Sequence, residues 1–149
     1  METSTPRNYV EEAIFIRQKD MRKKVLFTDI LWIGVDGNYC DIHLVSGEIM
    51  IVTHSLGDVE KKLPPESFIR IHRSYIINTH HVDGIIGNTV KIGNNLLPVS
   101  APYHQIVAPC FNLLEESDTL FKHKKREKRN GVDLDRYYQT VTDFLTPQP

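Results

Sequence analysis

Residues 68–78 read Phe68-Ile69-Arg70-Ile71-His72-Arg73-Ser74-Tyr75-Ile76-Ile77-Asn78. The beginning alternates, with Ile69 and Ile71 on one face and Arg70 and His72 on the other, which predicts a strand. Continued alternation would put Arg73 on the apolar face, where burial of an unpaired guanidinium is costly. The strand therefore ends or turns at Arg73, or partners hold this side chain, before the apolar pattern resumes and closes at residue 78.

Other short apolar stretches predict further strands, at 13–19, 25–27, 29–35, 39–45, 48–53, 85–86, 89–92 and 96–99. The polar residues 20–24 predict a turn. Alternation along 29–35 puts two apolar sets on opposite faces, Ile30, Trp32 and Gly34 against Leu31, Ile33 and Val35. A strand that is apolar on both faces is expected at the centre of a sheet.

Helical signals are few. Ser55 is a candidate N-cap for a short helix that ends before Pro64. Ser100 is a second candidate N-cap, ahead of a stripe at helical spacing that Pro109 must interrupt, Tyr103, Ile106, Val107 and Cys110. Strands outnumber helices without β-α-β alternation, so we expect a mostly β protein of about ten short, mainly antiparallel strands with one or two short helices.

The chain of 149 residues is expected to hold one domain at 13–114. Residues 1–12 are interpreted as a flexible arm, and residues 115–149 as a basic linker followed by an appended helix, or a segment that folds only on a partner. The apolar positions of that helical extension run from Val132 to Leu145.

Composition excludes several classes. No apolar run approaches membrane-spanning length and the N-terminus lacks the pattern of a signal peptide, so we expect a cytoplasmic protein without a membrane partner. The two cysteines, Cys40 and Cys110, allow one disulfide but are expected to be reduced thiols. The net charge of −1 argues against a simple nucleic-acid binder, although residues 122–129 hold six basic side chains and one acid.

Catalytic and metal-binding patterns are missing from the sequence. The seven histidines are scattered and no pair of cysteines or histidines has metal-ligand spacing. Phosphate-binding glycine loops and a Gly-x-Ser-x-Gly turn are absent as well. We therefore expect a protein that is not an enzyme and uses neither a metal nor a cofactor.

The basic residues have two interpretations on pattern alone. Arg70, His72 and Arg73 are either solvated charges at a sheet edge that block aggregation, or a binding site. The segment 37–39 is a plain hairpin turn or a contact loop, and the basic run is a solvated linker or a phosphate-contacting tail.

The ordered motifs together resemble the LytTR family of bacterial DNA-binding domains, over about Ile14 to Val107. The matching elements, in order, are 29–33, Gly37-Asn38-Tyr39, Ile42-His43-Leu44, Ser55-Leu56, Leu63-Pro64, the block 68–78, 82–86, 90–92 and Leu97-Pro98-Val99-Ser100. The resemblance implies an elongated stack of small antiparallel sheets. It also implies a transcriptional regulator whose loops enter successive major grooves of double-stranded promoter DNA, often on direct repeats.

Carried over to this sequence, the resemblance implies DNA contacts by Asn38, Tyr39, His72, Arg73 and Ser100. Arginine can pair with guanine or clamp a phosphate, and asparagine can read adenine. His72 is alternatively a structural residue that bonds across the turn. Phosphate contacts are further expected from four basic side chains, Arg70, Lys124, Lys125 and Arg126.

Two departures from the family pattern bear on function. Ala101 and Pro102 stand where many members carry a basic residue, so that contact is missing or moved. Only about twelve residues precede the domain, too few for a receiver domain, so we expect a stand-alone regulator or a fragment of a longer one. The alternative function is a protein-interaction module that binds or modulates another regulator. The C-terminal extension is the segment expected to contact such a protein partner, or a second copy of the chain in a homodimer.

Overall fold

The computed structural model describes residues 12–114, 120 and 121. The predicted arm, basic linker and appended helix therefore lie almost entirely outside the described residues, and so do Lys124, Lys125 and Arg126. Leu120 and the buried Phe121 pack against the domain, which shows that its core continues beyond the predicted boundary at residue 114.

The described chain is mostly β, as predicted. Its ten strands are β1 (Ala13–Gln18), β2 (Met21–Leu26), β3 (Ile30–Asp36), β4 (Tyr39–Leu44), β5 (Ile49–Val52), β6 (Phe68–His72), β7 (Tyr75–Asn78), β8 (Gly84–Ile86), β9 (Thr89–Ile92) and β10 (Asn95–Pro98). The described residues also form two short α-helices, α1 (Leu56–Glu60) and α2 (His104–Val107). Four single 3-10 turns lie at 27–29, 79–81, 101–103 and 108–110.

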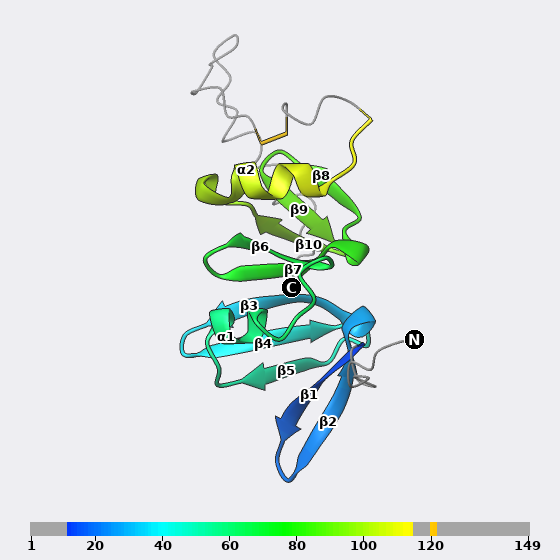
Figure 1. Cartoon of the computed structure of the whole chain (residues 1–149), viewed down its shortest axis with the longest axis vertical. Helices are drawn as coiled ribbons and strands as arrows, with labels where there is room; N and C mark the ends of the chain where they lie inside the picture. The colour runs from blue at the N-terminus through cyan, green and yellow to red at the C-terminus, as the bar shows by residue number, and fades with distance from the viewer. Residues whose placement is uncertain (1–11, 115–119, 122–149) are drawn as a thin grey trace, which may run out of the picture.

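The strands form three antiparallel sheets, stacked along the long axis of the molecule (Figure 1). The central sheet has the order β5-β4-β3-β7-β6, with the β1-β2 hairpin beyond one end of it and the β10-β9-β8 sheet beyond the other. As predicted, β3 is a central strand, between β4 and β7. The Pro98-containing β10 is an edge strand, where proline costs no ladder hydrogen bond. The predicted elongated stack of small sheets is confirmed.

Two apolar clusters cover opposite faces of the central sheet. The first core contains residues from β1 to β7 and α1, among them Ile16, Val25, Ile33, Ile42, Met50, Val59, Phe68 and Ile76. The second core joins the central sheet to β9, β10 and α2 through Ile71, Ile77, Val90, Ile92, Leu97, Val99, Val107 and Phe121. The β6-β7 hairpin contributes to both, so each of its faces is buried.

Of the two alternatives left open at Arg73, the structure has the turn, which separates β6 from β7, and the buried Asn78 ends the hairpin. The side-chain amide of Asn78 donates to the carbonyls of Phe27 at 3.2 Å and Ile30 at 2.9 Å, and its oxygen accepts from the backbone N–H of His80 at 3.0 Å. These bonds satisfy the buried polar group and fasten the end of β7 to the start of β3.

Two predictions about strands are wrong. The chain turns at Lys19 and Asp20, and β2 begins at Met21 rather than after a turn over 20–24, because β1 and β2 pair in a tight hairpin. The strict alternation expected along 29–35 is also broken by a bulge between Ile30 and Trp32. Ile30 and Ile33 consequently face the first core, while Leu31 and Trp32 face the second.

The helices agree with the sequence in part. The Ser55 hydroxyl caps α1 as predicted, accepting from the Asp58 N–H at 3.1 Å. Pro109 interrupts the second helix, but of the predicted apolar stripe Ile106 and Cys110 are exposed. Val107 is fully buried there, since a helix this short turns only a narrow face to the core.

Gly34 leaves room for two aromatic side chains that meet edge to face on the second-core side of the sheet. The ring centroids of Trp32 and Tyr75 lie 5.8 Å apart. A Cβ added at Gly34 would lie 2.9 Å from Cζ3 of Trp32 and 3.3 Å from Cε1 of Tyr75.

The substitution Gly34→Ala should therefore lower the free energy of unfolding by about 1–3 kcal/mol, because the extra methyl group overpacks the rings. Gly84→Ala is the matched control, since an added Cβ there meets no atom within 4 Å. Urea denaturation of both variants measures the difference. Equal midpoints for the two would contradict the steric role of Gly34.

Candidate nucleic-acid interface

Three loops lie together at one edge of the stack, on the left in Figure 1. They are the β3-β4 turn at 37–38, the β6-β7 turn at 73–74, and residues 99–103 between β10 and α2. Backbone hydrogen bonds tie them to one another: the Val35 N–H donates to the Ser74 carbonyl at 3.0 Å, and the Ser100 N–H donates to the Ile71 carbonyl at 3.0 Å. We call residues 37–39, 72–74 and 99–102 the loop edge.

The first of these loops presents Asn38 and Tyr39 to solvent. Gly37 adopts a positive φ of 61°, a conformation that favours glycine and closes the tight β3-β4 hairpin. Tyr39 is 50% exposed, and Asn38 beside it is exposed too. Both predicted contact residues are therefore accessible to a ligand along this edge.

Arg73 forms the tip of the second loop. Its side chain is exposed, and among residues 12–114, 120 and 121 its guanidinium has no hydrogen-bond or ion-pair partner. All its donors are thus available to a ligand, such as a phosphate or a base edge.

Arg70 has a different role from Arg73. Its guanidinium donates to the carbonyls of His72, at 3.1 Å, and Arg73, and pairs with the Glu60 carboxylate of the α1 helix at 3.3 Å. Arg70 thereby holds the backbone of the β6-β7 turn against α1. The phosphate contact expected of Arg70 stays a prediction. A phosphate would have to compete for the guanidinium with the three partners that Arg70 already has inside the chain.

His72 bonds across the same turn. Its Nδ1 accepts from the backbone N–H of Ser74 at 3.0 Å, and its ring lies 5.2 Å from that of Tyr75. Burial of the ring lowers the pKa of His72 below its ordinary 6.5, and the charges of Arg73 and Arg70 lower it further. The neutral imidazole therefore holds the turn, which favours the structural alternative for this residue.

Ser100 is half-buried in the third loop. Its N–H bonds to Ile71, and its carbonyl accepts from the Tyr103 N–H at 2.9 Å. Ser100 is the N-cap residue of the 3-10 turn at 101–103, as predicted, but its side chain makes no capping bond. Ala101 and Pro102 next to it are exposed, so the tip of this loop carries no charge.

A row of rings supports the loop edge and was not anticipated from the sequence. Trp32 stacks on His43, with centroids 3.6 Å apart and planes at 12°, and continues through Tyr75 to His72. The row thus crosses β4, β3, β7 and β6 in turn. Burial lowers the pKa of His43, opposed by the charge of Asp41, so the ring that stacks on Trp32 is neutral. His72 and Tyr75 belong to the block 68–78, but only the strand register brings Trp32 and His43 next to them.

Other chemistry finds little support in the described residues. No group of three or more histidine, cysteine or acidic side chains there could hold a metal ion. The thiols of Cys40, which is buried, and Cys110, which is exposed, are free. None of the described helices has the length and hydropathy needed to cross a membrane.

Comparison with protein families decides the relationship. Residues 20–106, more than half of the 149, match the family model of the LytTr DNA-binding domain. The chain belongs to this family. A LytTr DNA-binding domain from Bacillus cereus has the same fold, with a TM-score of 0.59 and 23% identity over 66% of this chain and 95% of that one.

Curated relatives of the LytTR domain are longer proteins. The sensory transduction protein LytT of Enterococcus faecalis is 31% identical over 114 residues, 69% of this chain and 47% of that protein. The transcriptional regulatory protein LytR of Staphylococcus aureus is 44% identical over 54 residues, 36% of this chain and 22% of that protein. The CO-responsive transcriptional regulator RcoM of Rhodospirillum rubrum is 34% identical over 53 residues, again 36% and 22%. The matches thus span about a fifth to a half of these relatives.

The role of His72 in the LytTR domain predicts a pH dependence. Because its pKa is lowered on folding, its contribution to stability is present above pH 6.5 and is lost as the pH falls through the folded-state pKa. An NMR titration should give His72 a pKa below 6.5. Arg73→Ala should raise that pKa only in part, because burial is the larger cause. A pKa at or above 6.5 in the parent chain would contradict the bond to Ser74.

Proposed function

We propose that this LytTR domain regulates transcription by binding specific promoter DNA, with the three loops of its loop edge entering successive major grooves. The observation that carries the proposal is the position of Arg73. It is an exposed arginine without a partner in the described chain, held at the tip of a turn that Arg70 and His72 brace from below.

The side chains suit distinct roles on DNA. Arg73 can donate two parallel hydrogen bonds to guanine, or clamp a phosphate. Asn38 can pair with the edge of adenine, while the hydroxyl of Tyr39 reaches a backbone phosphate. Ser100, tied through its backbone to Ile71, adds a short hydrogen-bonding side chain to the third loop. His72 positions Arg73 rather than contacting a base.

The backbones of these loops are fixed before DNA arrives. The hydrogen bonds from Val35 to Ser74 and from Ser100 to Ile71 join each loop to the central sheet or to its neighbour. Little conformational entropy is then lost on binding, which favours affinity from a small number of contacts.

The near-neutral net charge of the domain means that phosphate contacts must come from basic residues outside it. Residues 13–114 hold ten basic and nine acidic side chains, and the tip at Ala101 and Pro102 is uncharged. We propose that Lys124, Lys125 and Arg126 contact phosphates beside the loop edge. Occupation of direct repeats is a further part of the proposal.

The alternative function is an interaction module that binds another regulator. The exposed, uncharged pair Ala101 and Pro102 on the loop edge favours it, since a protein surface accepts such a tip more readily than DNA does. A protein partner would not depend on the guanidinium of Arg73 in the same way, and this difference separates the two functions.

Selection of genomic DNA fragments on the purified chain tests the proposal. We expect enrichment of a short repeated motif and a loss of about 5- to 150-fold in affinity for it in Arg73→Ala, since one bidentate contact contributes about 1–3 kcal/mol. Thermal stability should not change, because Arg73 is exposed and unpaired within the described chain.

Two variants serve as controls for this selection. Arg22→Ala removes an exposed arginine on β2 and should bind DNA like the parent chain. Arg70→Ala should lower both the melting temperature and DNA affinity, because it removes the brace beneath the turn. No enriched motif, or equal enrichment by Arg73→Ala, would favour the interaction module.

Salt dependence tests the basic run separately. Replacement of Lys124, Lys125 and Arg126 by alanine should reduce the slope of log affinity against log salt by about 0.9 for each phosphate that is no longer neutralised. Substitution is preferable to truncation at residue 120, since Phe121 belongs to the second core. An unchanged slope would place the phosphate contacts elsewhere.

A further inference from the structure

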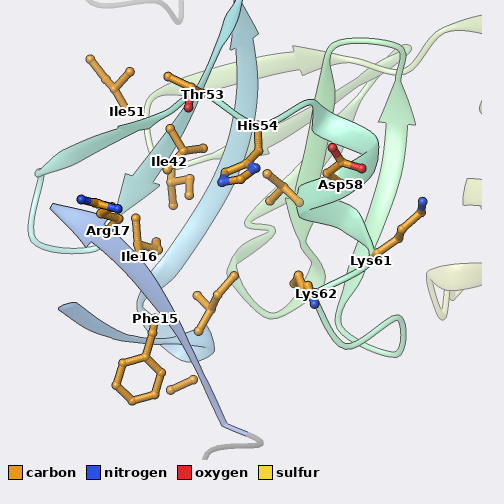
Figure 2. Close-up of a pocket in the computed structure, with 14 residues that line it drawn as sticks. Phe15, Ile16, Arg17, Ile42, Ile51, Thr53, His54, Asp58, Lys61 and Lys62 are labelled. Carbon is orange, nitrogen blue, oxygen red and sulfur yellow. The ribbon is translucent and has the colours of Figure 1, made fainter. Parts of the chain in front are cut away.

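A groove of about 860 Å³ lies between β1, β5 and α1 (Figure 2). Its lining includes residues 13–17 of β1 and residues 51–54 at the end of β5, together with Ile42 and four residues of the α1 region. Asn38, Tyr39, Arg73 and Ser100 do not line it. The groove therefore has a lining of its own, but it adjoins the loop edge, since Val52 pairs with Cys40 beside Tyr39 and Glu60 of α1 pairs with Arg70.

Two strand edges border this groove. Successive side chains of a strand point to opposite faces, yet five consecutive residues of β1 and four consecutive residues from Ile51 to His54 line it. In the described sheets β1 pairs only with β2, and β5 pairs only with β4, so each strand has an edge without a neighbouring strand. Such an arrangement suits an extended segment that pairs with an open edge.

The groove is apolar inside and basic at its rim. Ile16, Ile42 and Val59 of the first core lie in it, and Phe15 and Ile51 are 48% and 63% exposed at its margins. Figure 2 shows Arg17 on the β1 side and Lys62 on the α1 side.

The basic side chains outnumber the acidic one. The lining contains three of them, Arg17, Lys61 and Lys62, against Asp58 alone. Within the described chain neither lysine is paired with a carboxylate. The groove therefore suits an extended segment that carries apolar side chains and carboxylates.

We propose that this groove binds the segment 132–145 of a second copy of the chain. The segment reads Val132-Asp133-Leu134-Asp135-Arg136-Tyr137-Tyr138-Gln139-Thr140-Val141-Thr142-Asp143-Phe144-Leu145. It contains three aspartates and one arginine, opposite in sign to the rim. We take the segment as one that folds only on its partner: in its first four residues Val132 and Leu134 alternate with Asp133 and Asp135, so an extended conformation there would put apolar and acidic groups on opposite sides.

A second copy is the better source of this segment than the same chain. Phe121, the last described residue, packs in the second core, whereas the groove opens over the first core on the other side of the central sheet. Binding in the same chain would need the intervening residues to pass around the sheet. A contact from tail to groove joins two different surfaces, so it can link copies in one direction, as tandem sites on DNA require.

Sedimentation of the full chain without DNA tests this inference, over a range of protein concentrations. The parent chain should self-associate, and the double variant Lys61→Glu with Lys62→Glu should weaken association by about tenfold, because attraction becomes repulsion. Asp133→Lys with Asp135→Lys should weaken it similarly. An equimolar mixture of the two double variants should restore association, since the reversed tail of one then meets the reversed groove of the other.

The matched control is Lys24→Glu with Lys91→Glu, which makes the same change in charge outside the groove and should associate like the parent chain. Thermal melting of every variant checks the fold. A parent chain that stays monomeric, or a mixture that fails to restore association, overturns the inference. The DNA proposal is unaffected by either result, since Arg73→Ala should associate normally.

Discussion

The structure depends on one constraint: the central sheet must be buried on both faces. The β6-β7 hairpin meets it by sending Phe68 and Ile76 into the first core and Ile71 and Ile77 into the second. Full burial of each such side chain contributes about 1.5–3 kcal/mol, so this hairpin is among the larger sources of stability. A single buried amide, that of Asn78, closes the arrangement, and its three hydrogen bonds avoid the cost of about 1–3 kcal/mol for an unsatisfied buried group.

Burial of both faces also decides where polar chemistry can be placed. Side chains that need water are restricted to the ends and open edges of the central sheet, and the turns at one end form the loop edge. There the three basic residues of the β6-β7 hairpin, Arg70, His72 and Arg73, have different roles. Arg70 satisfies carbonyls and pairs with Glu60, His72 stays neutral and accepts from Ser74, and Arg73 has no partner for its guanidinium in the described chain. A rigid support beneath a single exposed arginine is the arrangement that sequence-specific contacts require, since misplacement by an ångström weakens paired hydrogen bonds.

The open strand edges raise a second problem, because an unpaired apolar edge is a template for aggregation. The edge of β5 carries Ile49, Met50, Ile51 and Val52 without a charge among them. Charged side chains from other elements, Arg17, Lys61 and Lys62, line the groove beside it and make uncontrolled pairing less favourable. The same charges select an acidic segment over a neutral one. Protection of an edge and choice of a partner therefore arise from the same residues.

The sequence by itself determined most of the strands, the Ser55 cap of α1 and membership of the LytTR family, because alternation, capping and motif order are local properties of the chain. Tertiary structure alone decided the bulge after Ile30, the separate roles of Arg70 and Arg73, and the stacking of Trp32 on His43. The sequence predicted both arginines as contacts, since it shows that each is basic but not which carbonyls lie within reach. That depends on how β6 pairs with β7 and where α1 places Glu60, and such long-range geometry leaves no trace in a local pattern.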